Sequence, residues 1–333
     1  MREVERQPRV DGYNLLVSVV CVSPAPHRRK MRIPLVLLLL SFLGADALRA
    51  LVTGAGGRTG SLIFRKLLTD YKAIEPVGLV RSKKAIKTLK KAGANAEQII
   101  SCDVSDVPSL TAAMAGCETV VLCTSAVPKI LPLSIVKLLF KKVVLRSKEP
   151  GRPKFKFGPQ GTPQEVDWLG AKNQIDAAKA AGVSHFVVIG SMGGTQPDNF
   201  LNGIGKRADG SGGDILLWKR KAERYLMASG LDYTIIHPGG LIDEPPAERQ
   251  LDVDVDDKLL DRRSRQIPRS DVCRVACAAV AKREEARGLS FDLVSLPVGE
   301  GTVTKHAAEV FARLGGRSCK YEETADPPSL PEL

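Results

Sequence analysis

The chain has 333 residues, of which 44% are hydrophobic, and a formal net charge of +12. This composition fits one large α/β domain or two small domains with an ordinary globular core. The charge is local: eight basic and four acidic residues in 1–50 give +4, nine basic and one acidic residue in 129–156 give +8, and the rest is neutral. A nucleic-acid binder needs a general basic surface, so nucleic acid is excluded as an expected partner.

The cysteines and acidic runs predict no metal site. Seven cysteines form no Cys-x-x-Cys pair, and no histidine follows Cys273 and Cys277 closely enough to complete a metal-binding set. We therefore expect reduced, structural cysteines. Asp252–Asp257 resembles a calcium loop, but Asp257 and Arg263 occupy the positions that require Gly and Glu. We interpret that segment as a solvated acidic loop.

Residues 1–47 are predicted to be a leader. Basic residues at 27–32 precede a short apolar run at 33–44 and small residues at 45–47, which is the order of a secretory signal peptide. The run is too short to span a bilayer, so we expect no transmembrane helix in the mature chain. Met31 is an alternative start. The leader suggests entry into the endoplasmic reticulum; an untargeted tail on a cytoplasmic protein is the alternative.

A strand, a glycine-rich turn and a helix follow the leader. The apolar run 48–52 predicts a buried strand, and the periodicity of 58–70 predicts a helix. Gly54 and Gly57 lie between the strand and the helix, and Gly60 lies in the helix. Their spacing differs by one residue from the dinucleotide-binding fingerprint. The first glycine allows a tight turn, the second close approach of a pyrophosphate, and the third close packing of helix on strand. This unit predicts a bound dinucleotide at the helix N-terminus.

The second predicted strand, 75–81, ends in basic residues where an NAD-dependent enzyme usually carries an acidic one. Arg81 and Ser82 stand at this position, followed by two lysines. A carboxylate would repel a 2′-phosphate, whereas a guanidinium can bind it with two hydrogen bonds. The sequence therefore favours NADP(H) over NAD.

Helices and strands alternate along the rest of the chain. Further strands are expected at 97–102, 119–123, 185–190, 233–237 and 289–294, and further helices at 83–92, 107–115, 163–181, 215–229, 270–281 and 304–314. This alternation predicts an α/β fold with a doubly wound parallel sheet, the Rossmann fold. We expect a single domain at 48–320, interrupted by an insertion at 128–159 and followed by a tail at 321–333.

The insertion breaks the alternation with apolar patches among basic residues. Three interpretations remain open: a lid over the cleft, a contact with a membrane surface or a protein through 129–156, and a plain solvated excursion.

Several strings together carry a family resemblance: TGAGGRTG at 53–60, LVRS at 79–82, TSAVPK at 124–129, VDWLGAKNQIDAAKAAGV at 166–183, GSMGGT at 190–195 and WKRKAE at 218–223. The chain resembles the atypical short-chain dehydrogenase/reductases over residues 48–315, in particular plant and algal NAD(P)-binding, NmrA-like proteins. These include the NADP domain of a chloroplast inner-envelope translocon subunit. The resemblance makes the plastid an additional expected location.

The resemblance implies a bound NADP(H). It implies pyrophosphate contacts from the glycine-rich turn, 2′-phosphate contacts from the second strand, adenine contacts from the third, and ribose and nicotinamide contacts from later segments. The residues implied, in that order, are Gly54, Gly57, Arg58, Thr59 and Gly60; Arg81 and Ser82; Asp103 and Val104; and Thr124, Ser125, Ser191 and Lys219.

One departure from the family affects the expected chemistry. Active short-chain dehydrogenases place a Tyr four residues before the Lys, and the Tyr passes a proton to the substrate oxygen. If Lys219 is that Lys, Ile215 stands in place of the Tyr. Ser191 occupies the place of the supporting Ser, and His237 is a candidate acid. We therefore expect an NADP-dependent oxidoreductase that reduces a small or flavin-like acceptor; the alternative is a non-catalytic NADP(H) sensor.

Overall fold

The computed structural model describes residues 47–143, 146, 153–207, 209 and 212–321. The predicted leader therefore lies outside the described residues except for Ala47, and the predicted tail except for Tyr321. No helix within the described ranges combines the length and the apolar character needed to cross a membrane.

An eight-stranded sheet forms the centre, in the order β3-β2-β1-β4-β7-β8-β12-β10. Its strands are β1 (Leu48–Thr53), β2 (Ile74–Val80), β3 (Ile99–Ser101), β4 (Thr119–Leu122), β7 (His185–Ile189), β8 (Asp232–Pro238), β10 (Leu251–Asp254) and β12 (Leu289–Ser295). Every neighbouring pair is parallel except β10 with β12. The chain winds outward from β1 to β3 and then crosses back to β4, so the sheet is doubly wound, as predicted.

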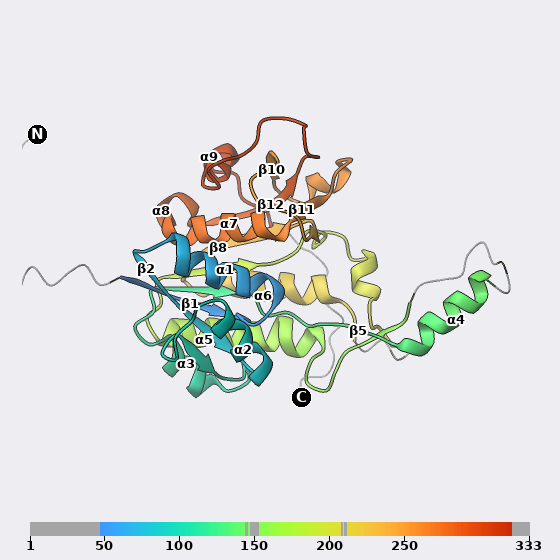
Figure 1. Ribbon diagram of the computed structural model, residues 1–333, viewed down its shortest axis with the longest axis horizontal. Helices are drawn as coiled ribbons and strands as arrows, with labels where there is room; N and C mark the ends of the chain where they lie inside the picture. Colours follow the sequence, from blue (N-terminus) through green and yellow to red (C-terminus); the bar gives the residue numbers. More distant parts are fainter. Residues whose placement is uncertain (1–46, 144–145, 147–152, 208, 210–211, 322–333) are drawn as a thin grey trace, which may run out of the picture. The chain divides into compact units, whose positions relative to one another are not determined.

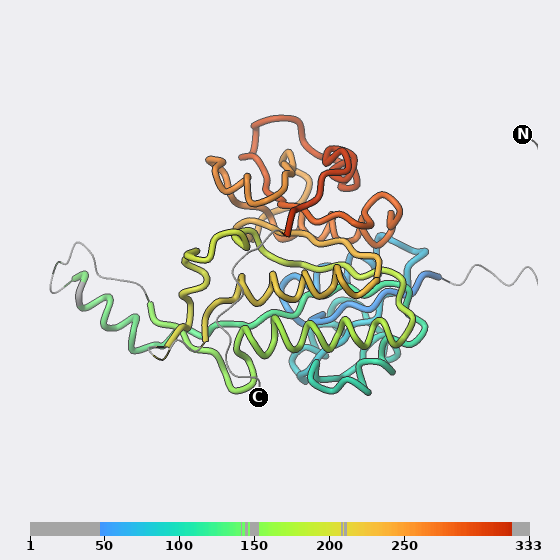
Figure 2. Tube along the Cα trace, turned by 180° about the vertical axis from the view of Figure 1, so that it is seen from behind, coloured from blue at the N-terminus to red at the C-terminus, as the bar shows by residue number. Residues whose placement is uncertain are grey.

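Helices cover both faces of the sheet, as the two opposite views in Figure 1 and Figure 2 show. One face packs on α1 (Arg58–Asp70) and α7 (Arg269–Ala281), the other on α3 (Val107–Met114), α5 (Ala171–Ala180) and α6 (Ile215–Ala228). Alternate residues of β1 serve the two cores: Val52 joins the α1 and α7 side, and Leu51 the opposite side. Burial on both faces explains why the central strands are nearly continuous apolar runs. Three further helices are α2 (Lys83–Lys91), α8 (Arg283–Ala286) and α9 (Glu309–Leu314).

Short elements complete the described structure. A π-helix (η3, Gln164–Gly170) precedes α5, so the single helix predicted over 163–181 has two parts. Strands β9 (Gly240–Ile242) and β11 (Gln266–Pro268) form a small parallel pair. The insertion contains β5 (Lys129–Ile130) paired antiparallel with β6 (Phe155–Lys156), and α4 (Pro132–Val143) follows β5. Two 3-10 turns, η4 (Phe200–Gly203) and η5 (Lys258–Asp261), lie in later loops.

The interpretation of 252–257 as a solvated acidic loop is wrong. Leu251–Asp254 is β10, the antiparallel edge strand of the main sheet, and Leu251 is fully buried. Asp257, beyond the strand, is also buried. The two carboxylates of β10 hide its alternation of apolar and polar residues, which is the pattern of a strand. One of them, Asp254, forms an ion pair with Arg317 from the segment after α9. The strand joins the sheet because Leu251 and Val253, which alternate with the two carboxylates, are buried against it.

Candidate functional site

The turn after β1 brings α1 unusually close to the backbone of that strand. Gly54 has φ +62°, and a Cβ there would lie 2.9 Å from the carbonyl oxygen of Cys123. A Cβ on Gly60 would lie 2.4 Å from the carbonyl oxygen of Gly54. At the start of α1, the N-cap Gly57 supplies no side-chain hydrogen bond. The positive end of α1 is therefore left open to an anion, with no Cβ in the way.

A cavity of about 780 Å³ opens in front of this turn, at the carboxyl edge of the sheet where the strand order reverses. This is where doubly wound sheets bind dinucleotides, and the volume is that of a ligand pocket. Eight of the predicted cofactor-binding residues line it: Gly54, Gly57, Arg81, Ser82, Asp103, Val104, Thr124 and Ser125.

The other predicted cofactor residues lie outside this lining. Gly60 packs under the turn, and Arg58 forms an ion pair with Asp243. Thr59, Ser191 and Lys219 line a second cavity, described below. The structure thus groups the turn and the strand ends around one cavity. Its neighbour is lined by Thr59, which was predicted at the pyrophosphate, and by Ser191 and Lys219, two of the four residues predicted at the ribose and nicotinamide.

Arg81 lies at the end of the cavity formed by β2 and β3. Its side chain is 65% exposed, and its guanidinium lies 3.4 Å from the Asp103 carboxylate. Burial by itself would raise the pKa of Asp103. Hydrogen bonds from Ser105, together with the charge and the hydrogen bond of Arg81, have the larger effect, so the pKa of Asp103 is lowered. Ser82 caps α2 by accepting a hydrogen bond from the Ala85 N–H at 3.2 Å. The exposed guanidinium remains accessible to an anionic group in the cavity.

Two amides at the start of α5 hold the strand ends that line the cavity. The Asn173 side chain donates to the Val104 carbonyl at 3.1 Å, and that of Gln174 donates to the Thr124 hydroxyl at 3.1 Å. Both amides therefore have structural partners across the cavity wall.

A second cavity of about 320 Å³ adjoins the first and shares Cys123 and Ser125 with it. Besides Ser125, its polar and charged lining comes from Thr59, Ser191 and Lys219. Ile215, which stands in place of the family's Tyr, also lines it. The remaining wall is mostly apolar: Pro128, Phe157, Ile189, Leu201, Ile204, Leu216 and Leu241. The arrangement suits a small, largely apolar molecule lying beside a cofactor.

Lys219 has a buried partner that the sequence motifs did not reveal. Its ammonium lies 2.8 Å from Oδ1 of Asp167, whose side chain is 0% exposed. The second carboxylate oxygen accepts a hydrogen bond from the Ala126 N–H at 3.0 Å. Asp167 therefore fixes Lys219 against the chain that follows β4. Asp167 lies within the family-like string at 166–183, but no spacing rule relates it to Lys219.

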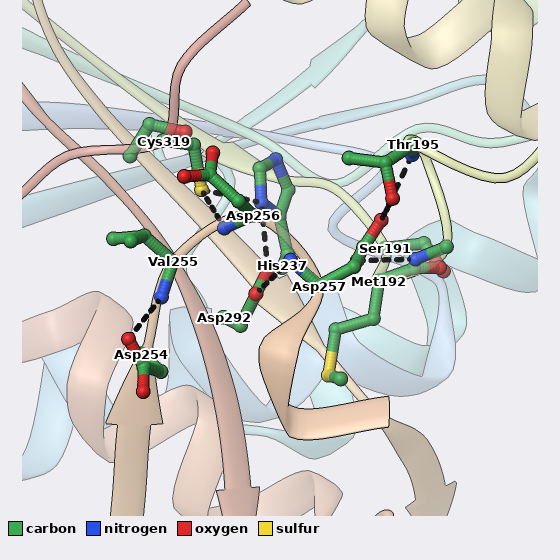
Figure 3. Close-up of polar contacts among 12 residues, drawn as sticks. Ser191, Met192, Thr195, His237, Asp254, Val255, Asp256, Asp257, Asp292 and Cys319 are labelled. Atoms are coloured by element: carbon green, nitrogen blue, oxygen red, sulfur yellow. Dashed lines mark hydrogen bonds and ion pairs between the residues drawn. The ribbon is translucent and has the colours of Figure 1, made fainter. Parts of the chain in front are cut away.

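His237 does not line either cavity. It lies at the end of β8, 2% exposed, behind Gly190. Its Nε2 is 3.2 Å from Glu223. Its Nδ1 is 3.3 Å from Asp292, as Figure 3 shows. Burial would lower the pKa of His237, but the Glu223 charge together with Tyr321, Asp292 and Cys319 raises it well above 6.5. This placement argues against the predicted role as a direct proton donor to a substrate.

His237, Asp292 and Cys319 each offer one ligand atom within 4.8 Å of the others. The imidazole already has a carboxylate on each nitrogen, so ion pairs account for the cluster.

The same cluster reaches the loop that carries Ser191. The Asp257 N–H donates to Asp292 at 2.6 Å, and the Asp257 carboxylate accepts from the Gly193 N–H at 2.6 Å and from Thr195 (Figure 3). Through these contacts, Asp292 and Asp257 hold in place the loop that contributes Ser191 to the wall of the second cavity.

The residues from 54 to 283 match the protein-family model described as NAD(P)H-binding. An uncharacterized chloroplastic protein of Arabidopsis thaliana is 41% identical over 269 residues, which cover 81% of this chain and 76% of that protein. Sanguinarine reductase of Eschscholzia californica is 40% identical over 273 residues, which cover 80% and 96%. A putative NAD-dependent epimerase/dehydratase of Bacillus halodurans shares the fold, with a TM-score of 0.56 and 23% identity over 80% of this chain and all of that one.

Proposed function

The chain belongs to the NAD(P)H-binding family, as the resemblance in the sequence implied, and from this premise we propose that it is an NADPH-dependent reductase of a small, largely apolar acceptor. The observation that carries the proposal is the pair of adjoining cavities that share Cys123 and Ser125. The larger one would hold the dinucleotide against the turn after β1. The smaller one would place an acceptor beside the nicotinamide end. NADPH, when bound, supplies a hydride.

Arg81 supports the preference for NADP(H) over NAD. It presents an exposed guanidinium at the end of β2, followed on the chain by Ser82 and two lysines. Asp103 neutralises part of this charge and also keeps the guanidinium oriented at the edge of the cavity. A 2′-phosphate would gain charge-assisted hydrogen bonds here, which a 2′-hydroxyl cannot match.

The second cavity supports an acceptor of mixed character, apolar over most of its surface with one electron-accepting group. Lys219 is the cationic group on its wall and would stabilise negative charge that develops on that group as hydride arrives. Ser191 would orient the same group. Because Ile215 cannot donate a proton, water or the Lys219 ammonium would supply it.

A second candidate is a non-catalytic NADP(H) sensor that reports cofactor occupancy to a partner. The observation that favours it is Ile215 on the wall of the second cavity, at the position from which a Tyr would act. The nearby Tyr225 is no substitute, because its hydroxyl donates to Asp176 at 2.6 Å.

One set of titrations separates the two candidates. The purified protein is titrated with NADPH, NADP⁺ and NADH by fluorescence, and NADPH consumption is then followed with quinone, flavin and aldehyde acceptors. Turnover of an acceptor by NADPH is the result expected of the reductase, and Lys219→Met combined with Asp167→Asn, which leaves no unpaired buried charge, should reduce it. NADPH binding without turnover of any acceptor supports the sensor instead. Absence of NADPH binding contradicts both.

We propose the plastid as the location, on the strength of the chloroplastic relative in Arabidopsis thaliana. Fusion of residues 1–47 to a fluorescent protein tests this: plastid import is expected, whereas import into the endoplasmic reticulum would favour the signal-peptide interpretation of the leader.

A further inference from the structure

Helix α4 of the insertion exposes a long apolar face. Leu133, Val136, Phe140 and Val143 recur at the three- and four-residue spacing of one side of a helix, and their side chains are 76%, 61%, 54% and 69% exposed. Ile135 and Leu139 extend the same face and are also exposed. Monomeric soluble proteins rarely leave so many large apolar side chains together in water, so this face is expected to have a partner.

The opposite side of α4 is attached to the rest of the insertion. The Ser134 hydroxyl donates to the Leu131 carbonyl at 2.6 Å and accepts from the Lys154 N–H at 3.0 Å. Leu138, one turn further on, is half-buried. These contacts orient the helix with respect to β5 and β6 and leave the apolar face directed away from them.

Basic residues surround the apolar face. Lys137 and Lys142 are exposed at its two edges, and Lys129, Lys154 and Lys156 are exposed on β5 and β6. The described part of 129–156 contains no acidic residue. Long lysine side chains beside an apolar face can extend their ammonium groups to a layer of anionic groups while their methylenes stay in apolar surroundings.

We propose that α4 is an interfacial anchor that docks the protein on an anionic lipid bilayer. The apolar face would enter the boundary between headgroups and acyl chains, and the flanking lysines would bind the lipid phosphates. Charge complementarity favours this partner: a protein surface would have to be both apolar and strongly acidic to match the same face, whereas an anionic bilayer presents both properties everywhere.

Docking would bring the second cavity near the lipid. Pro128 and Phe157, which flank β5 and β6 on the chain, both line that cavity. An apolar acceptor could then pass from the bilayer to the cavity with little exposure to water. This consequence rests on the proposed reductase function, but the docking itself does not.

A tryptophan reporter on the helix tests the docking in the full chain. Phe140→Trp is mixed with vesicles of phosphatidylglycerol or of phosphatidylcholine, and a blue shift of fluorescence is expected with the anionic vesicles. Val298→Trp is the matched control, because Val298 is 59% exposed on a loop outside the insertion. The leader is the same in both proteins, so its own lipid affinity cannot produce a difference between them.

Binding to the anionic vesicles is then measured by sedimentation for two further variants. Leu133→Ser with Val136→Ser and Phe140→Ser is expected to weaken binding roughly tenfold or more. Lys137→Gln with Lys142→Gln should weaken it about fivefold per lysine. Equal spectra of Phe140→Trp with and without lipid would overturn the proposal. So would a dimer in analytical ultracentrifugation that the triple serine variant converts to monomer, because a second copy would then cover the face.

Discussion

The Lys219 ammonium lies 2.8 Å from the Asp167 carboxylate, in a position where the family resemblance places a Lys beside a Tyr. The pair joins α6 to the π-helix before α5. Asp167 contacts the segment that follows β4, and Lys219 lines the second cavity. Its carboxylate is buried, so the two charges depend on each other. A carboxylate therefore holds Lys219 in this chain, and Ile215 stands where the family has the Tyr phenol.

Asp167→Asn is expected to lower the free energy of unfolding by about 3 kcal/mol, because it leaves the Lys219 charge in a largely buried place without its counter-ion. Urea denaturation measures this loss. Adding Lys219→Met to Asp167→Asn should restore part of it, since the unpaired charge is then gone. Glu309→Gln, which breaks the exposed pair with Arg313, is the control and should cost less than about 1 kcal/mol. Equal effects of the two carboxyl substitutions would contradict the assignment.

Gly60→Ala is expected to weaken NADPH binding at least about tenfold, because its Cβ would lie 2.4 Å from the Gly54 carbonyl oxygen and push α1 away from the turn. Fluorescence titration measures the affinity. Gly203→Ala is the control, as nothing lies within 4 Å of its added Cβ. If both variants bind NADPH like the unaltered protein, the turn is not the pyrophosphate site.

Arg81→Ala is expected to weaken NADPH binding about tenfold or more, the usual effect of losing a charge-assisted hydrogen bond to phosphate. NADH affinity in the same variant should stay nearly constant, because NADH has no 2′-phosphate. A parallel loss for both nucleotides would mean that Arg81 supports the cavity wall and does not read the phosphate.

The raised pKa of His237 predicts that the folded protein loses stability at high pH. Its pKa in the folded protein is raised well above 6.5, mainly by Glu223 acting against the effect of burial. Its contribution is therefore fully present below pH 6.5 and is lost as the pH rises through the raised pKa, at up to about 1.4 kcal/mol per pH unit. Urea denaturation from pH 6 upward should show this slope, and His237→Gln should flatten it. An unchanged slope in the variant would contradict the ion-pair network.

The lowered pKa of His185 predicts that the folded protein also loses stability at low pH. Burial, with a smaller contribution from Arg283, lowers its pKa to about 4. Its Nε2 lies 2.9 Å from the Thr234 hydroxyl, which donates to the Ala286 carbonyl, so the ring nitrogen is the donor. The stability that a neutral ring provides is present above pH 6.5 and is lost as the pH falls toward 4. His185→Gln keeps a donor and should reduce this loss, measured by urea denaturation between pH 4 and 7.

The sequence alone determined the features that depend on local chemistry. The helix predicted at 58–70 has the same bounds as α1, because its apolar periodicity and the glycines before it both act over a few residues. Asp106 caps α3 through an equally local contact, accepting from the Ser109 N–H at 3.2 Å. The alternation of strands and helices was sufficient for the doubly wound sheet, whereas the preference for NADP(H) inferred from Arg81 stays a prediction.

Only the tertiary structure decided which distant residues meet. Asp167 and Lys219 come from different helices, and no spacing in the chain relates them. The acidic segment at 251–254 joins the sheet with Leu251 and Val253 buried, and Arg317, from the other side of α9, pairs with Asp254. His237 lies near the end of β8, yet Glu223 and Asp292 hold its ring behind Gly190, away from the cavities. Ion pairs and burial are properties of the folded chain, so patterns read along the sequence could not predict them.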